Sequence, residues 1–334
     1  MQSLLIQNLR HRLQKRLQKF ETESVDAFLI YLKQFWLFFD NSPIYVGIME
    51  QLVTKFNPEL DEVIRGIFEQ GARDMGESEE RQAATGYLVL RKLSTINQQK
   101  VFEDIAFRYG SIVGSGVSPT IKKPSIRVIT LVFLNPFFEY LDEQLDEQKI
   151  ILSLLIRYKH RSEWFHREQL QNLIKNDSRK AEKLLALNFY SYLYDQGLDF
   201  MIEPSSKQGI IDIIAAQNTK DPLLADAKIF DPDSSRGKRY IRKAFNQIYT
   251  YTQQYNEPFG YLVIFKNTDT DLCFLLSNTS SSVPVVTYNY KSIFFITIDI
   301  YENPKSVSQR DPLKMIKITE EELIQSAEDS ETNT

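Results

Sequence analysis

The spacing of apolar residues changes near residue 178, and this change restricts the fold more than any other feature of the chain. Before it, apolar residues recur every three or four positions, as in Phe28, Leu32, Phe35 and Phe39, with few glycines. That spacing predicts amphipathic helices packed on one another. After it, the apolar segments are short, rich in β-branched residues and separated by turn residues, which predicts strands.

The order of these segments predicts an α+β chain of two domains. An all-helical domain is expected over residues 1–176, and an α/β sandwich with a mixed central sheet over residues 177–317. The sequence after Lys317 is acidic and nearly free of aromatic residues, which predicts a disordered tail over 318–334. Strands are expected at 199–204, 209–217, 222–230, 259–266, 272–277 and 291–301, with helices at 181–197 and 242–255.

Composition limits the classes of function. The 334 residues carry a net charge of −4, so nucleic-acid binding would have to be local. One cysteine and three histidines are too few for an internal disulfide framework or a zinc cluster, and carboxylates would have to hold any metal. The N-terminal residues resemble neither a signal peptide nor a membrane span. We therefore expect a cytoplasmic protein that makes no membrane contact.

Two aspartates stand inside apolar strand candidates. Asp212 lies in GIIDII and Asp226 in LLADAKIF, where an unpaired carboxylate would cost several kcal/mol of desolvation. A hard divalent cation such as Mg²⁺ would compensate two such carboxylates. Lys228 follows Asp226 by two positions and shares its strand face, because strand side chains alternate with period two. Its ammonium group would orient an attacking water or neutralise charge on a phosphate.

These residues resemble the PD-(D/E)XK nuclease superfamily, which has the restriction-endonuclease-like fold. The match consists of Asp212 followed by Asp226-Ala227-Lys228, with the acidic Glu182 on the helix before the strands. The resemblance implies that Asp212, Asp226 and the carbonyl of Ala227 bind the metal and that Lys228 acts on the nucleophile. Glu182 would assist through water, although a glutamate in the first turn of a helix also suits the helix dipole.

The resemblance extends over residues 178–302. Gln247 and Tyr251 stand four residues apart on the helix after the strand of Asp226, as in many members of the family. Ile211 replaces the proline that often precedes the first aspartate, and this departure does not affect the chemistry. A surface position is the alternative for Gln247. The implied catalytic set is Glu182, Asp212, Asp226, Lys228 and Gln247.

The family implies a Mg²⁺-dependent endonuclease that hydrolyses DNA, with Mn²⁺ able to substitute. A ribonuclease would carry the same site, and a non-catalytic nucleic-acid-binding or scaffold protein would use the fold alone. Cutting a duplex with one site per chain often requires two copies, so a homodimer or a protein partner held by the helical domain is expected. Restriction or antiphage defence is the expected role, with repair and mobile-element processing as the alternatives.

A basic segment lies between the strand of Asp226 and the next helix. It would supply salt-sensitive, largely sequence-independent contacts to phosphates, and the alternative is a solvated helix start. The predicted nucleic-acid-binding residues are Arg236, Lys238, Arg239, Arg242 and Lys243.

A separate pair, Arg161 and His166, has the spacing found in HEPN ribonucleases. The flanking residues form a polar helix face, which favours a structural interpretation of this pair over a catalytic one.

Overall fold

The computed structural model describes residues 4–74, 76–111, 122–197, 201–202, 214–215, 223–277, 283–302 and 314–331. Its contacts divide the chain into two compact units. We call Ile6–Lys149 the helical unit, and Ile150–Thr334 with Met1–Leu5 the C-terminal unit. The α+β organisation is therefore confirmed at this level, with helices in the N-terminal part and a mixed sheet in the C-terminal part.

The helical unit is built around an aromatic core. Phe39 and Phe137 are completely buried, with ring centroids 5.9 Å apart, and Tyr87 packs on both rings. Gly86 allows helix α5 to approach η3 closely, because a Cβ at this position would overlap the carbonyl oxygen of Phe133. The described elements are α1 (Leu4–Leu17), η1 (Gln18–Phe20), α2 (Val25–Asp40), α3 (Pro43–Phe56), α4 (Glu59–Arg65), η2 (Gly66–Gln70), α5 (Glu79–Ile96), α6 (Gln99–Gly110), α7 (Lys122–Ile129), η3 (Thr130–Leu134) and the start of α8 (Asn135–Trp164).

The C-terminal unit contains a mixed sheet of six strands in the order β1-β2-β3-β4-β7-β6. Strands β3, β4 and β7 run parallel, whereas the other pairings in this sheet are antiparallel. A second pair, β5 and β8, is parallel. The elements after α8 are α9 (Arg167–Asn176), α10 (Ala181–Asp195), β1 (Met201–Ile202), β2 (Ile214–Ala215), β3 (Ala225–Phe230), η4 (Pro232–Ser234), α11 (Lys238–Gln254), β4 (Phe259–Lys266), β5 (Asp271–Leu275), β6 (Val285–Tyr288), β7 (Lys291–Asp299), β8 (Met315–Thr319) and α12 (Glu320–Glu331).

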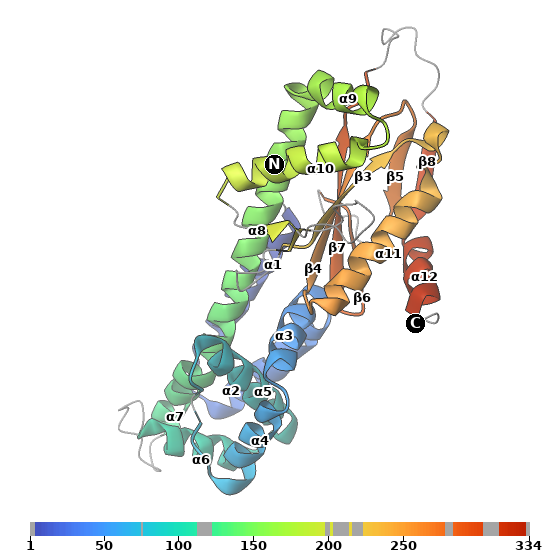
Figure 1. Cartoon of the computed structure of the whole chain (residues 1–334). Helices are drawn as coiled ribbons and strands as arrows, with labels where there is room; N and C mark the ends of the chain where they lie inside the picture. The colour runs from blue at the N-terminus through green and yellow to red at the C-terminus, as the bar shows by residue number, and fades with distance from the viewer. Residues whose placement is uncertain are drawn as a thin grey trace. The chain divides into compact units, whose positions relative to one another are not determined.

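Helices cover both faces of this sheet. On one face, α11 buries Ile248 against Leu262 of β4, and Figure 1 shows α11 lying along the strands with α12 beside it. On the other face, the ring of Tyr158 in α8 contacts Phe265 of β4 and Phe189 of α10. Gly260 of β4 lets α11 approach the sheet, because a Cβ there would lie 2.6 Å from a methyl carbon of Ile248. The strands that carry the candidate site are thus enclosed between helices.

The boundary between the two parts differs from the expected one at 176/177. The division falls between Lys149 and Ile150, inside α8, so the end of α8 and all of α9 belong to the C-terminal unit. Tertiary contacts explain the shift, because Lys159 donates to the carbonyl of Thr297 in β7 and Glu163 accepts from the backbone N–H of Asp299. Helical periodicity alone cannot show which core a helix joins.

The prediction of a disordered tail over 318–334 was wrong for the described part of that segment. Residues Glu320–Glu331 form α12, and Ile318, Leu323 and Ala327 are completely buried in the core beneath α11. A capping box begins the helix: Thr319 accepts from the N–H of Glu322, and Glu322 accepts from the N–H of Thr319. The acidic composition obscured three well-placed apolar residues.

Four of the expected strands are present, as β3, β4, β5 and β7. Strands β6 and β8 were not expected, and both are short. The expected strands at 199–204 and 209–217 lie mostly outside the described residues. None of the helices in the described part of the chain is long and apolar enough to cross a membrane.

Candidate active site on strand β3

Strand β3 carries a buried ion pair. All six of its residues are buried, and Asp226 and Lys228 are only 1% and 7% exposed. The Lys228 ammonium nitrogen lies 2.9 Å from Oδ2 of Asp226. Both residues share the α11 face of the sheet with Phe230, and their partners on β4 are the completely buried Leu262 and Ile264. Two charges in such surroundings require each other. The sequence predicted the shared strand face of Asp226 and Lys228, but it predicted a metal ion, and not this ion pair, as the compensation for the buried carboxylate.

Glu182 joins this strand from α10. Its Oε1 accepts the backbone N–H of Ile229 at 3.0 Å, and its two oxygens accept the Tyr240 hydroxyl at 2.6 and 2.7 Å. Burial raises the pKa of Tyr240 above its ordinary value, and the charges of Glu182 and Asp226 raise it further. Both carboxylates are therefore close enough to this phenol to oppose its ionisation.

The backbone of β3 shows which way Ala227 presents its carbonyl. Leu224 and Phe230 accept hydrogen bonds from backbone N–H groups on the β4 side, so even-numbered residues of β3 face β4. The N–H of Ile229 faces the opposite edge, where Glu182 accepts it. Residues alternate along a strand, so the Ala227 carbonyl also faces that edge. The carbonyl predicted as a metal ligand therefore shares an edge with the Glu182 carboxylate.

Gln247 lies on α11 between Tyr240, which contacts Glu182, and Tyr251, which contacts Leu224 of the strand segment. Its Nε2 is 3.4 Å from the hydroxyl of Tyr251, and Tyr251 packs on Leu224, which shares the strand face of Asp226. At the other end of the helix, Tyr240 reaches Glu182. Residues 240, 247 and 251 follow the helical repeat, so they form one stripe that faces β3. Gln247 and Tyr251 thus lie on the side of α11 that faces β3.

Tyr240 is a member of the site that the sequence did not single out. The available signal was its spacing, seven residues before Gln247 on the same helix face. The contact with Glu182 depends on how α10 and α11 meet at β3, which the sequence does not show.

Asp212 lies outside the described residues, so its predicted role has no geometry to report. The short strand β2 pairs with β3 through Ile214 and Ala225, next to Asp226 in sequence. Within the described ranges, no group of three or more histidine, cysteine, aspartate or glutamate residues could hold a metal ion. The buried carboxylate of Asp226 and the edge carbonyl of Ala227 are oxygen donors of the kind that Mg²⁺ prefers. A complete magnesium site would require Asp212 as well.

Two of the predicted phosphate-binding residues are instead engaged with α12. Lys238 forms an ion pair with Glu322 at 2.6 Å, and Nε of Arg242 donates to the main-chain carbonyl of Glu322 at 2.8 Å. Ser326 donates in turn to the carbonyl of Arg242. These contacts attach the start of α11 to α12, so we assign Lys238 and Arg242 a structural role.

The other three basic residues lie differently. Arg239 and Lys243 are exposed and one helical turn apart, so they present their charges on one face of α11. Arg236 is half-buried, with its Nε 4.0 Å from Oε1 of Glu182 and a terminal nitrogen 3.5 Å from the carbonyl of Ser178. The basic surface beside β3 is therefore narrower than the sequence predicted.

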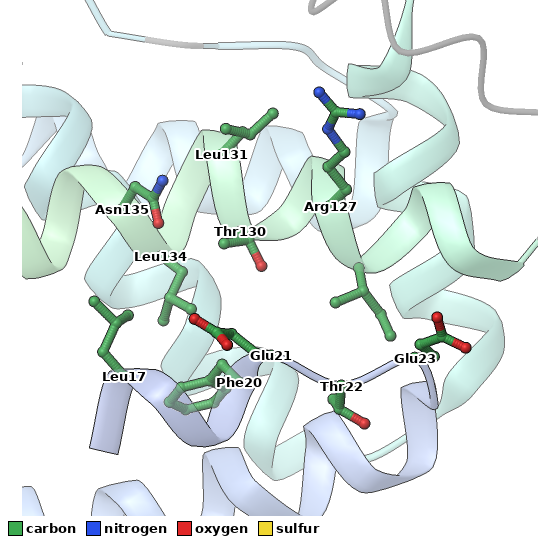
Figure 2. A pocket seen from close by; sticks show the side chains of 11 residues that line it. Leu17, Phe20, Glu21, Thr22, Glu23, Arg127, Thr130, Leu131, Leu134 and Asn135 are labelled. Atoms are coloured by element: carbon green, nitrogen blue, oxygen red, sulfur yellow. The ribbon is translucent and has the colours of Figure 1, made fainter. Parts of the chain in front are cut away.

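A separate hollow of about 470 Å³ lies within the helical unit. Phe20 and Glu21 line it from one segment, and Thr130 and Leu134 line it from η3 (Figure 2). The side chain of Arg127 points away from Phe20 in this view. Every residue predicted for catalysis belongs to the C-terminal unit, so this hollow is distinct from the candidate active site.

Comparisons with protein-family models, with curated proteins and with solved structures find no match to this chain.

Proposed function

We propose that the C-terminal unit is a Mg²⁺-dependent nuclease of the PD-(D/E)XK type that hydrolyses phosphodiester bonds in DNA. The observation that carries the proposal is the ion pair of Asp226 and Lys228, buried on β3 beside the anchored Glu182. A buried ion pair gives a sheet little structural advantage, because a protein with apolar residues of similar size in its place is often at least as stable. A chemical use for both groups would explain why the pair is present.

The chain's own residues divide the work as follows. Asp226 and the carbonyl of Ala227 would hold the metal together with Asp212, and Mn²⁺ would also suit these oxygen donors. When bound, the ion would polarise a phosphate oxygen and lower the pKa of a bound water. Lys228 would orient that water or neutralise charge on the phosphate during displacement. Exposed Arg239 and Lys243 would hold neighbouring phosphates.

Glu182 has a more restricted role than the family resemblance implies. Both of its oxygens accept hydrogen bonds from Tyr240, and one also accepts from β3. We therefore assign Glu182 to fixing the position of β3 and Tyr240. Gln247 would be a positioning residue as well, through its contact with Tyr251. Two copies of the chain would allow both strands of a duplex to be cut, and defence against foreign DNA is the role we propose for such an enzyme.

The test is incubation of the purified chain with plasmid, linear DNA and RNA, in Mg²⁺ or EDTA. Lys228→Met should reduce cleavage by about 100-fold or more, because it removes a charged group from the reacting centre. Lys266→Met is the matched control: Lys266 lies on the neighbouring strand, is 8% exposed, and is paired with Asp271 at 2.7 Å and Asp299 at 3.0 Å. It should retain cleavage.

Four results would contradict the proposal in different ways. Equal loss of cleavage in both lysine variants would indicate a stability effect in place of chemistry. Full activity in EDTA would remove the metal from the mechanism. Cleavage of RNA alone would replace DNA as the substrate, and binding without any cleavage would favour the non-catalytic alternative.

A further inference from the structure

The junction of α8 and α9 exposes two large aromatic side chains next to each other. Trp164, the last residue of α8, is 78% exposed, and the adjacent Phe165 is 83% exposed. Large aromatic side chains are usually buried, and adjacent exposed ones commonly mark a binding surface. They belong to the C-terminal unit. Their rings therefore offer two uncovered faces to a partner.

Basic residues line the face of α8 that ends at this pair. Arg157, His160, Arg161 and Trp164 are spaced by three and four residues, so they form a single helical stripe. Arg157 and His160 are exposed and Arg161 is half-buried. The stripe places two arginines on the helix face that ends at Trp164. Its length of about 10 Å, at roughly 1.5 Å per residue, suits two or three nucleotides.

The single acidic residue in this stretch does not cancel the charge of the stripe. Residues 157–167 contain four arginines or lysines and one glutamate, Glu163. Glu163 pairs with Lys159 and accepts from the backbone of Asp299, so both side chains of that pair are directed at β7. The net positive charge that remains comes from Arg157, Arg161 and Arg167.

Arg161 is held in place at the centre of the stripe. Its Nε donates to Nε2 of His166 at 3.1 Å, and Nδ1 of His166 contacts Oε1 of Gln169 at 2.8 Å. The guanidinium also lies 5.3 Å from the ring centre of Tyr192. The bond to His166 uses Nε, so the two terminal nitrogens retain their capacity to donate to a phosphate. Holding the group in this way reduces the entropy lost on binding.

We infer that this surface binds single-stranded nucleic acid. We call it the α8–α9 corner and define it by Arg157, His160, Arg161, Trp164, Phe165 and Arg167. Bases would stack on the rings of Trp164 and Phe165, and the phosphates would contact the arginines. A duplex covers the faces of its bases by stacking them on one another, whereas a single strand leaves them accessible. The excess of arginines over acidic residues in this surface complements the phosphates of a nucleic-acid strand.

The two tryptophans of the chain make the inference directly measurable. Trp36 is 5% exposed in the core of the helical unit, so a bound base can quench only Trp164. We expect short oligothymidylate or oligouridylate, added in EDTA, to quench tryptophan fluorescence, and a blunt duplex of the same length to bind at least about tenfold more weakly. Comparing the two oligomers assigns the preferred sugar. EDTA separates this binding from hydrolysis, so it can stand or fail independently of the nuclease proposal.

Variants decide between stacking and other uses of the surface. Combined Trp164→Ala and Phe165→Ala should weaken binding of a fluorescein-labelled single strand by about 100-fold in fluorescence anisotropy, given tenfold per lost stack. Phe107→Ala, at a 49% exposed aromatic residue of the helical unit, is the matched control and should bind normally.

The inference is overturned if the double variant binds like the unmodified chain, if duplex and single strand bind equally, or if no quenching occurs. It is also overturned if gel filtration shows that the double variant converts a dimer into a monomer, because the occupant would then be a second copy of the chain.

Discussion

The buried pair of Asp226 and Lys228 leads to a quantitative expectation. Replacing Lys228 by Met leaves the Asp226 carboxylate, 1% exposed in the native chain, without its ammonium partner 2.9 Å away. Removing one member of a buried ion pair typically costs about 3–5 kcal/mol. Asp226→Asn should have a similar cost, because it leaves the ammonium group buried without a countercharge. Each single variant should therefore open the sheet roughly a thousandfold more readily, at about 1.4 kcal/mol per factor of ten.

The double variant Asp226→Asn, Lys228→Met should behave differently. It removes both charges, and such replacements are often neutral or even stabilising. We expect its stability to lie within about 1 kcal/mol of the native chain, which makes the two substitutions strongly non-additive. Cleavage should nevertheless be lost in the double variant. Its stability is close to that of the native chain, but it lacks both proposed catalytic side chains. This combination separates the structural role of the pair from its chemical role.

Hydrogen exchange followed by mass spectrometry is the appropriate assay. Peptides from β3 and β4 report on the C-terminal unit alone, whereas global unfolding would mix signals from both units. Peptides from α5 in the helical unit provide the internal control and should exchange at unchanged rates. The reasoning is refuted if either single variant protects β3 as well as the native chain does. It is equally refuted if the double variant is destabilised by the sum of the two single effects.

Three further expectations concern single contacts. Tyr240→Phe removes the hydroxyl that donates to Glu182, and should destabilise the C-terminal unit by about 1.5–3 kcal/mol in hydrogen exchange of β3; unchanged exchange would show that the contact contributes nothing. Gly86→Ala should destabilise the helical unit by about 1–3 kcal/mol in hydrogen exchange of α5, since the new methyl group overlaps the backbone of Phe133; unchanged exchange of α5 would contradict this close approach. Glu322→Ala removes the capping box and the partner of Lys238, and should speed exchange in α12 by a factor that corresponds to about 1 kcal/mol; no change would contradict the structural role given to this contact.

The sequence alone determined strands β3, β4 and β7 and the strand face shared by Asp226 and Lys228. Short β-branched segments predicted β3, β4 and β7, because a parallel sheet buried on both faces must consist of continuous apolar strands. Period-two alternation then placed Asp226 and Lys228 on one face, and the 2.9 Å contact between them follows from that spacing. These features depend on neighbouring residues in the chain, which is why they could be predicted.

Features that depend on distant residues were decided only by the tertiary structure. The hydrogen bonds from Tyr240 to Glu182 join residues of two helices, and no local pattern indicates them. The order of Lys238 and Glu322 along the chain likewise gave no sign of their ion pair, so a phosphate-binding role and a structural role could not be distinguished beforehand. Helix α12 was missed because acidic composition predicts disorder, whereas burial of its apolar residues beneath α11 provides the stability that composition does not show.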